Sequence, residues 1–85
     1  MTSNLLASIL KNMYSNTKTD KVAMIHLFGI KYAKEIRDNN ININEILKTA
    51  EMPVSYHTEI SKGIKLAKYV DLKNEYKYWF VSSLR

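Results

Sequence analysis

Apolar residues recur at helical spacing near the start of the chain. The stripe consists of Leu5, Leu6, Ile9, Leu10 and Met13. Residues three or four positions apart lie on one face of an α-helix, so this stripe predicts an amphipathic helix over residues 3–15. Thr2 or Ser3 can cap that helix with a side-chain oxygen, and residues 16–18 predict a turn.

A second apolar segment follows at residues 22–36. Its first half is apolar nearly all round and its second half is amphipathic, which is typical of a central, buried helix. Thr19 or Asp20 can cap the segment, and residues 37–40 end it, because Asp and Asn favour turns. Gly29 costs about 1 kcal/mol relative to Ala inside a helix. It therefore marks either a close helix crossing or a break into two helices.

Residues 42–63 predict two short helices joined by a tight turn. The first has an apolar face at helical spacing, formed by Ile43, Ile46, Leu47 and Ala50. Asn42, with Glu45 three residues later, is similar to a capping box, so this helix is expected to begin near Asn42 or Ile43. Pro53 cannot continue the helix but suits a first helical turn, so the second helix is expected to begin between residues 53 and 55.

This stretch resembles the helix-turn-helix of the lambda-repressor-like (Xre-like) transcription regulators. The matching positions are the small turn residue, the apolar residue after the turn, a Ser-x-Ile step and a closing glycine, here Ala50, Met52, Thr58 with Ile60, and Gly63. Glu51 stands where that family's turn usually has Gly, Leu47 where Ala is usual, and His57 where a buried Ile or Val is usual. The resemblance implies that the second helix enters the major groove of duplex DNA.

The pattern changes after Gly63. Ile64, Leu66 and Ala67 can extend the second helix by a turn. Residues 69–73 and 76–81 then alternate and are rich in β-favouring side chains, with Asn74 and Glu75 between them. We expect either a β-hairpin that forms a wing, or a core or interface segment. The predicted fold is thus a mainly α, single helix-turn-helix domain over residues 1–85, with a winged variant as an alternative.

The amino-acid composition indicates which classes of partner the protein can bind. The chain has 85 residues, a formal net charge of +5 and no cysteine, so we expect one domain and no disulfide or thiolate chemistry. A pI near 9.5 makes a polyanion a sensible partner. No stretch is long and apolar enough for a membrane span, and no basic region precedes the first apolar stripe, so a cytoplasmic protein is expected.

The outer face of the second helix is the candidate reading surface. Hydroxyl groups can bond bases or phosphates, Glu can accept from cytosine, and Lys can reach guanine or phosphate. Lys68, Lys73 and Lys77 lie where a wing would meet the phosphate backbone, unless they only protect a strand edge. The predicted DNA-binding residues are Ser55, Tyr56, Thr58, Glu59, Lys62, Lys65, Lys73 and Lys77. The alternative is an ordinary solvated face.

The sequence contains no motif typical of an enzyme. His26 and His57 are the only histidines, and no carboxylate stands at ligand spacing, so structural histidines are expected and no metal site. There is no nucleophile signature and no glycine-rich phosphate loop. We therefore expect a protein that is not an enzyme, with no cofactor and no small-molecule ligand.

The leading hypothesis is a small, sequence-specific, double-stranded DNA-binding transcriptional regulator. It would act as a homodimer, with the N-terminal stripe favoured over the hairpin as the contact. Ile60, Leu47 and Ala50 are expected to form the small core that fixes the angle between the two helices. The alternative is a protein–protein interaction module, such as a phage or mobile-element accessory protein or a small subunit of a complex. Stacking of single-stranded nucleic acid on the C-terminal aromatics is a third hypothesis.

Overall fold

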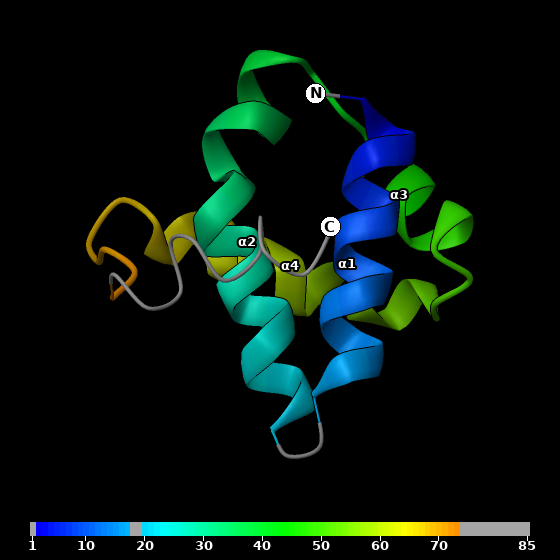
Figure 1. Ribbon diagram of the computed structural model, residues 1–85. Coiled ribbons are helices and arrows are strands. Elements are labelled where there is room, and N and C mark those ends of the chain that lie inside the picture. The colour runs from blue at the N-terminus through cyan, green and yellow to red at the C-terminus, as the bar shows by residue number, and fades with distance from the viewer. Residues whose placement is uncertain (1, 18–19, 74–85) are drawn as a thin grey trace.

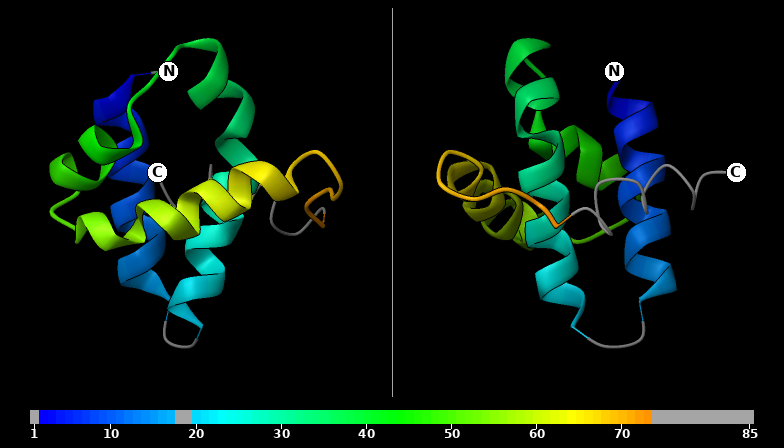
Figure 2. Two further views of the ribbon diagram at one scale, coloured as in Figure 1. Left: turned by 180° about the vertical axis from the view of Figure 1, so that it is seen from behind. Right: turned by 60° about the vertical axis from the view of Figure 1, so that its left-hand side comes forward.

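The computed structural model describes residues 2–17 and 20–73 of the chain. Within these ranges the chain forms α1 (Ser3–Asn16), α2 (Lys21–Asp38), α3 (Ile43–Thr49), a short 3-10 helix η1 (Val54–Tyr56) and α4 (His57–Leu66). The helices α1 and α2 run antiparallel, α3 lies beside α1, and α4 lies across the pair (Figures 1 and 2). The prediction of a small, mainly helical domain is confirmed.

Side-chain caps fix the starts of three helices, because each accepts from backbone N–H groups that the first turn leaves without a partner. The Leu5 N–H donates to Thr2 Oγ1 at 3.1 Å, and the Ala23 N–H donates to Asp20 Oδ1 at 3.1 Å. Asn42 Oδ1 accepts from the N–H of Asn44 at 2.8 Å. The cap of α1 is thus Thr2, of the two residues that the sequence offers, and the cap of α2 is Asp20. The predicted cap at Asn42 is confirmed.

Within the described part of the chain, one apolar core joins the four α-helices. Its fully buried large side chains are Leu6, Ile9, Leu10, Met13, Ile25, Phe28, Ile46, Leu47 and Ile60. The predicted small core is confirmed as part of it, since Ile60 and Leu47 are 0% exposed and Ala50 is 2% exposed.

The N-terminal stripe does not form a free surface. Leu6, Ile9, Leu10 and Met13 belong to the central core, and only Leu5 is exposed. The idea that this stripe is available as a dimer contact is therefore wrong. A domain of this size has one core to fill, and the best apolar stripe of its first helix is needed there.

The helices α2 and α4 cross at two glycines. A Cβ atom at Gly63 would lie 2.3 Å from the backbone oxygen of His26, and one at Gly29 would lie 2.6 Å from that of Ile60. Backbone atoms cannot give way as a flexible side chain can, so only glycine permits this approach. Gly29 therefore marks a crossing and not a break. Gly63 lies within α4, where it serves this crossing, and does not close the motif after the helix.

The helices α2 and α3 end in the same way. Ile41 N–H donates to Ile36 O at 2.9 Å, and Met52 N–H donates to Leu47 O at 2.9 Å, which are the six-residue bonds of Schellman motifs. The residue before each donor is left-handed: Asn40 has φ 54° and Glu51 has φ 59°. Glu51 thus occupies a left-handed conformation that glycine adopts more readily.

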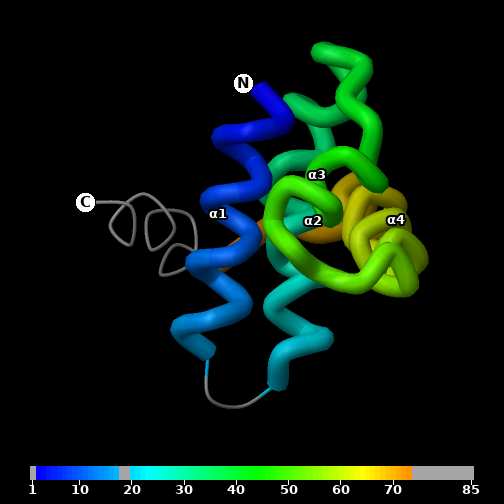
Figure 3. Tube along the Cα trace, turned by 90° about the vertical axis from the view of Figure 1, so that its right-hand side faces the viewer, coloured from blue at the N-terminus to red at the C-terminus, as the bar shows by residue number. Residues whose placement is uncertain are grey.

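The connection from α3 to α4 is longer than the tight turn that the sequence predicts. It spans residues 50–56 and contains η1, in which Tyr56 N–H donates to Pro53 O at 3.1 Å. The α-helix begins at His57 and not between residues 53 and 55, because Pro53 is extended (ψ 136°) and the next turn is 3-10. Figure 3 follows the chain from α3 through this connection into α4.

The described residues contain no β-strand, so the first predicted hairpin strand, 69–73, is absent. Tyr69 N–H donates to Leu66 O at 2.8 Å, and Val70 N–H donates to the same oxygen at 3.1 Å. These bonds prolong the helical turn and override the β preference of the side chains. The second predicted strand, 76–81, lies outside the described residues. No helix in residues 2–17 or 20–73 combines the length and apolar character needed to cross a bilayer.

Candidate nucleic-acid interface

The two faces of α4 have different surroundings. Ile60 and Gly63 are buried on the inner face, while Thr58, Lys62 and Lys65 are exposed on the outer face. Figure 2 shows α4 lying over the α1–α2 pair from the outside. The structure thus places three of the predicted contact residues together on one free helical face. Ser55 is exposed in η1, just before this face begins.

Glu59 lies at the edge of α4 and not on the outer face. The His26 Nε2–H donates to Glu59 Oε2, and Lys62 Nζ lies 3.4 Å from Glu59 Oε1. The hydrogen bond from His26, followed by the positive charge of Lys62, holds the pKa of Glu59 below its usual value. Glu59 therefore anchors α4 to α2. The sequence gives no signal for this pair, because the two residues are 33 positions apart.

Tyr56 is also turned toward the body of the domain. Its hydroxyl lies 3.0 Å from that of Tyr14, and the two rings are 5.8 Å apart between centroids. This hydrogen bond, followed by burial, raises the pKa of Tyr56. Lys21 covers the Tyr14 ring at 4.4 Å and donates to the Tyr14 backbone oxygen. Tyr56 thus attaches η1 to α1.

Both histidines have hydrogen-bond partners. His57 is exposed, and its Nδ1 lies 2.9 Å from Asn44 Oδ1, which connects the starts of α4 and α3. His26 is bound by Glu59. Among residues 2–17 and 20–73, no three side chains of the metal-ligating types lie together in a way that could hold an ion. These interactions give both histidines structural roles.

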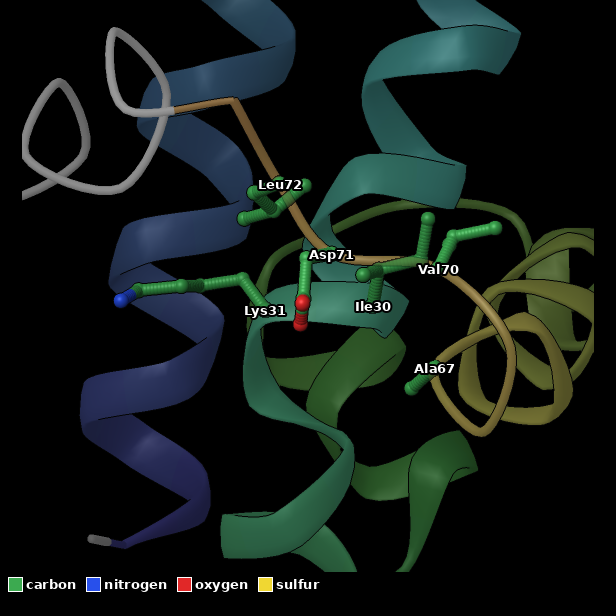
Figure 4. A pocket seen from close by; sticks show the side chains of 6 residues that line it. All are labelled: Ile30, Lys31, Ala67, Val70, Asp71 and Leu72. Carbon is green, nitrogen blue, oxygen red and sulfur yellow. The ribbon is translucent and has the colours of Figure 1, made fainter.

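The predicted wing cations lie beyond α4. Lys73 is exposed at the end of the described segment, and Lys77 lies outside the described residues. The chain after α4 folds back across α2, where Val70, Asp71 and Leu72 cover Ile30 and Lys31 (Figure 4). A hollow of about 190 Å³ lies between the two segments, and Figure 4 shows the six side chains that line it.

Sequence reasoning missed a group of cations on α2. Lys31, Lys34 and Arg37 line a second hollow of about 230 Å³ together with Lys68 from the segment after α4. The two hollows adjoin, since both are lined by Ile30, Lys31 and Ala67. The spacing of the three α2 cations, three residues apart, could have indicated a shared helical face. Nothing in the sequence indicates that Lys68 joins them.

The comparisons with known proteins agree with the fold. Residues 2–73 match the model of a protein family described as "HTH-like domain". This match covers every described helix. No curated protein and no solved structure matches the chain.

Proposed function

The chain belongs to the HTH-like domain family, and we propose that it binds duplex DNA through the outer face of α4. The observation that carries the proposal is the contrast between the two sides of this helix. Packing against α2 fixes its inner side, whereas Thr58, Lys62 and Lys65 remain exposed on its outer side. Helix-turn-helix proteins present such a face to the major groove.

The dimensions of α4 suit this role. Its ten residues give a length of about 15 Å, and the major groove is roughly 12 Å wide. The Thr58 hydroxyl can donate to or accept from base edges or phosphates, and the Lys62 and Lys65 ammonium groups can only donate. Glu59 is engaged by His26, so it positions the helix in this proposal and does not read bases. The protein would act by binding and not by catalysis.

Sequence-specific control of transcription is the finer form of the proposal. A protein bound in the major groove at a promoter would exclude polymerase, and a two-fold dimer would require a palindromic site. The test is a gel shift with duplexes of about 30 base pairs that together cover the DNA upstream of the gene. A random duplex of equal length serves as the competitor. Equal competition by the random duplex would restrict the proposal to non-specific DNA binding.

A variant test addresses the α4 face directly. Lys62→Ala should weaken duplex binding by roughly 5- to 150-fold if Lys62 contacts a base, or reduce the salt slope by about 1 if it contacts phosphate. Lys48→Ala is the matched control, because Lys48 is also an exposed helical lysine but lies on α3. Equal affinity and equal salt slope in both variants would remove Lys62 from the interface.

A second candidate function is protein interaction through a different surface. Leu66, Tyr69 and Val70 are exposed near the end of α4, and Tyr69 is 82% exposed. Apolar residues gathered in this way mark contact sites more often than scattered ones do. If a homodimer forms, we propose this patch as its contact. Light scattering of the wild type and of Tyr69→Ala would show whether the patch holds two copies together.

A further inference from the structure

We infer that the cationic groove between α2 and the segment after α4 binds the phosphate backbone of the same duplex whose major groove α4 enters. This groove is defined by Lys31, Lys34, Arg37 and Lys68. The inference rests on the proposed function and extends the DNA contact to α2. The sequence alone predicts no role for Lys31, Lys34 or Arg37.

The first support is charge. Four of the residues that line the groove are cations and none is acidic. Two acidic residues of the same helical stretch, Glu35 and Asp38, are not among its lining residues. Asp71 lines the neighbouring hollow, so four cations face one carboxylate when both hollows are taken together. An excess of positive charge of this kind attracts a polyanion, because cations that neutralise phosphates release the counterions of the nucleic acid.

The second support is that these cations are unpaired within the described residues. The ion pairs there are Lys11 with Glu51, His26 with Glu59, and Lys62 with Glu59. None of them involves a cation of the groove. Lys34, Arg37 and Lys68 are exposed, so their charges are available to an external partner.

The third support is continuity with the proposed reading face. Lys62, Lys65 and Lys68 follow one another at intervals of three residues, and Lys68 N–H donates to Lys65 O at 3.3 Å, which keeps the helical turn going to Lys68. Lys31, Lys34 and Arg37 repeat the same interval on α2. Lys68 ends the first row and lines the groove together with the second row. A duplex contacted at Lys62 and Lys65 would therefore bring a phosphate strand to α2.

The test measures the salt dependence of duplex binding by fluorescence anisotropy, with a fluorescein-labelled random duplex of about 24 base pairs. The groove variant is Lys34→Ala with Arg37→Ala. The control variant is Lys11→Ala with Lys48→Ala, which removes the same amount of positive charge. Lys11 lies in the middle of its helix, as Lys34 does, and Lys48 lies in the last turn of its helix, as Arg37 does. A third variant, Thr58→Ala with Lys62→Ala, reports on α4. Circular dichroism shows that each variant is folded.

Each phosphate contact contributes about 0.9 to the slope of log affinity against log salt. The groove variant should therefore lower this slope by about 1.8 relative to the control. A groove variant that matches the control while the wild type binds would overturn the inference and leave the proposed function standing. Loss of binding in the groove variant with full binding in the Thr58 and Lys62 variant would support the groove and refute the α4 face. Absence of wild-type binding at low salt would overturn both.

Discussion

The inner face of α4 packs against the rest of the chain, whereas its outer face does not. On the inner face, Ile60 is 0% exposed and Gly63 touches the backbone of α2. On the outer face, no hydrogen bond or ion pair within residues 2–17 and 20–73 joins Thr58, Lys62 or Lys65 to another helix. Packing thus fixes the position of α4, whereas the fold does not constrain which side chains stand on its outer face.

The largest effect is expected where α2 and α4 cross at Gly29 and Gly63, because a substitution there disrupts the packing of the inner face. Gly63→Leu would force a large side chain into the backbone of α2, where no side-chain rearrangement can make room. We expect loss of the cooperative thermal transition. Lys65→Leu adds the same side chain at an exposed position of the same helix and should stay folded. A cooperative transition near the wild-type temperature for Gly63→Leu would show that the crossing is not as close as described.

The next effect concerns the apolar part of the inner face. Ile60→Ala leaves a cavity in the core and should lower the free energy of unfolding by roughly 2–5 kcal/mol. That is a large share of the stability of a small domain. Ile64→Ala, at a partly buried position of the same helix, should cost less. Urea unfolding monitored by circular dichroism gives both values, and a reversed order would mean that the helix is rotated relative to this account.

Glu59 lies at the border between the two faces and should make stability depend on pH. Its pKa is lowered from 4.5 by the hydrogen bond from His26 and by Lys62. The ionised carboxylate therefore stabilises the fold above its unfolded pKa, and this stabilisation is lost as the pH falls through the folded pKa. Glu59→Gln should lower the melting temperature at neutral pH, and the gap to the wild type should narrow toward about pH 3.

The matched control for this titration is Glu45→Gln. Glu45 is also an acid in the first turn of its helix, but it is exposed. Its removal should change the melting temperature little, because an exposed side chain contributes little to stability. If the difference in melting temperature between Glu59→Gln and the wild type stays constant from neutral pH to about pH 3, the negative charge of Glu59 does not stabilise the fold.

The smallest effect is expected at the connection between α3 and α4. Glu51 is left-handed with φ 59°, a conformation that glycine adopts without strain. Glu51→Gly should raise the melting temperature modestly, although it removes the pair with Lys11, because exposed pairs contribute little. Asn40→Gly should change it less, since Asn tolerates this conformation better. A lower melting temperature for Glu51→Gly would show that the ion pair with Lys11 stabilises the fold by more than the left-handed conformation costs.

The sequence predicts the parts of this fold that depend on nearby residues. The helices, the caps at Thr2, Asp20 and Asn42, and the burial of Leu47 and Ile60 follow from spacing and capping chemistry over a few positions. Two errors have a common cause, which is that local preference does not report tertiary packing. The N-terminal stripe fills the core instead of forming an interface. Tyr69 and Val70 prolong a helical turn where the sequence predicts the strand 69–73.

The candidate site was predictable only in part. Helical spacing places Thr58, Lys62 and Lys65 on one exposed face. It cannot show that Glu59 turns toward His26, or that Tyr56 turns toward Tyr14, because both contacts join residues more than thirty positions apart. The cations of α2 and Lys68 likewise come together only through the crossing of α2 and α4.

The contrast between the faces is tested most directly by nuclear magnetic resonance of the wild-type chain. Duplex DNA is added in steps, and the backbone amide shifts are followed residue by residue. We expect the changes to concentrate at Ser55, Thr58, Lys62 and Lys65 on the outer side, with little change at Leu6 and Ile9 in the core of α1. Shifts that cluster on α1, or no shifts at low salt, would contradict the account.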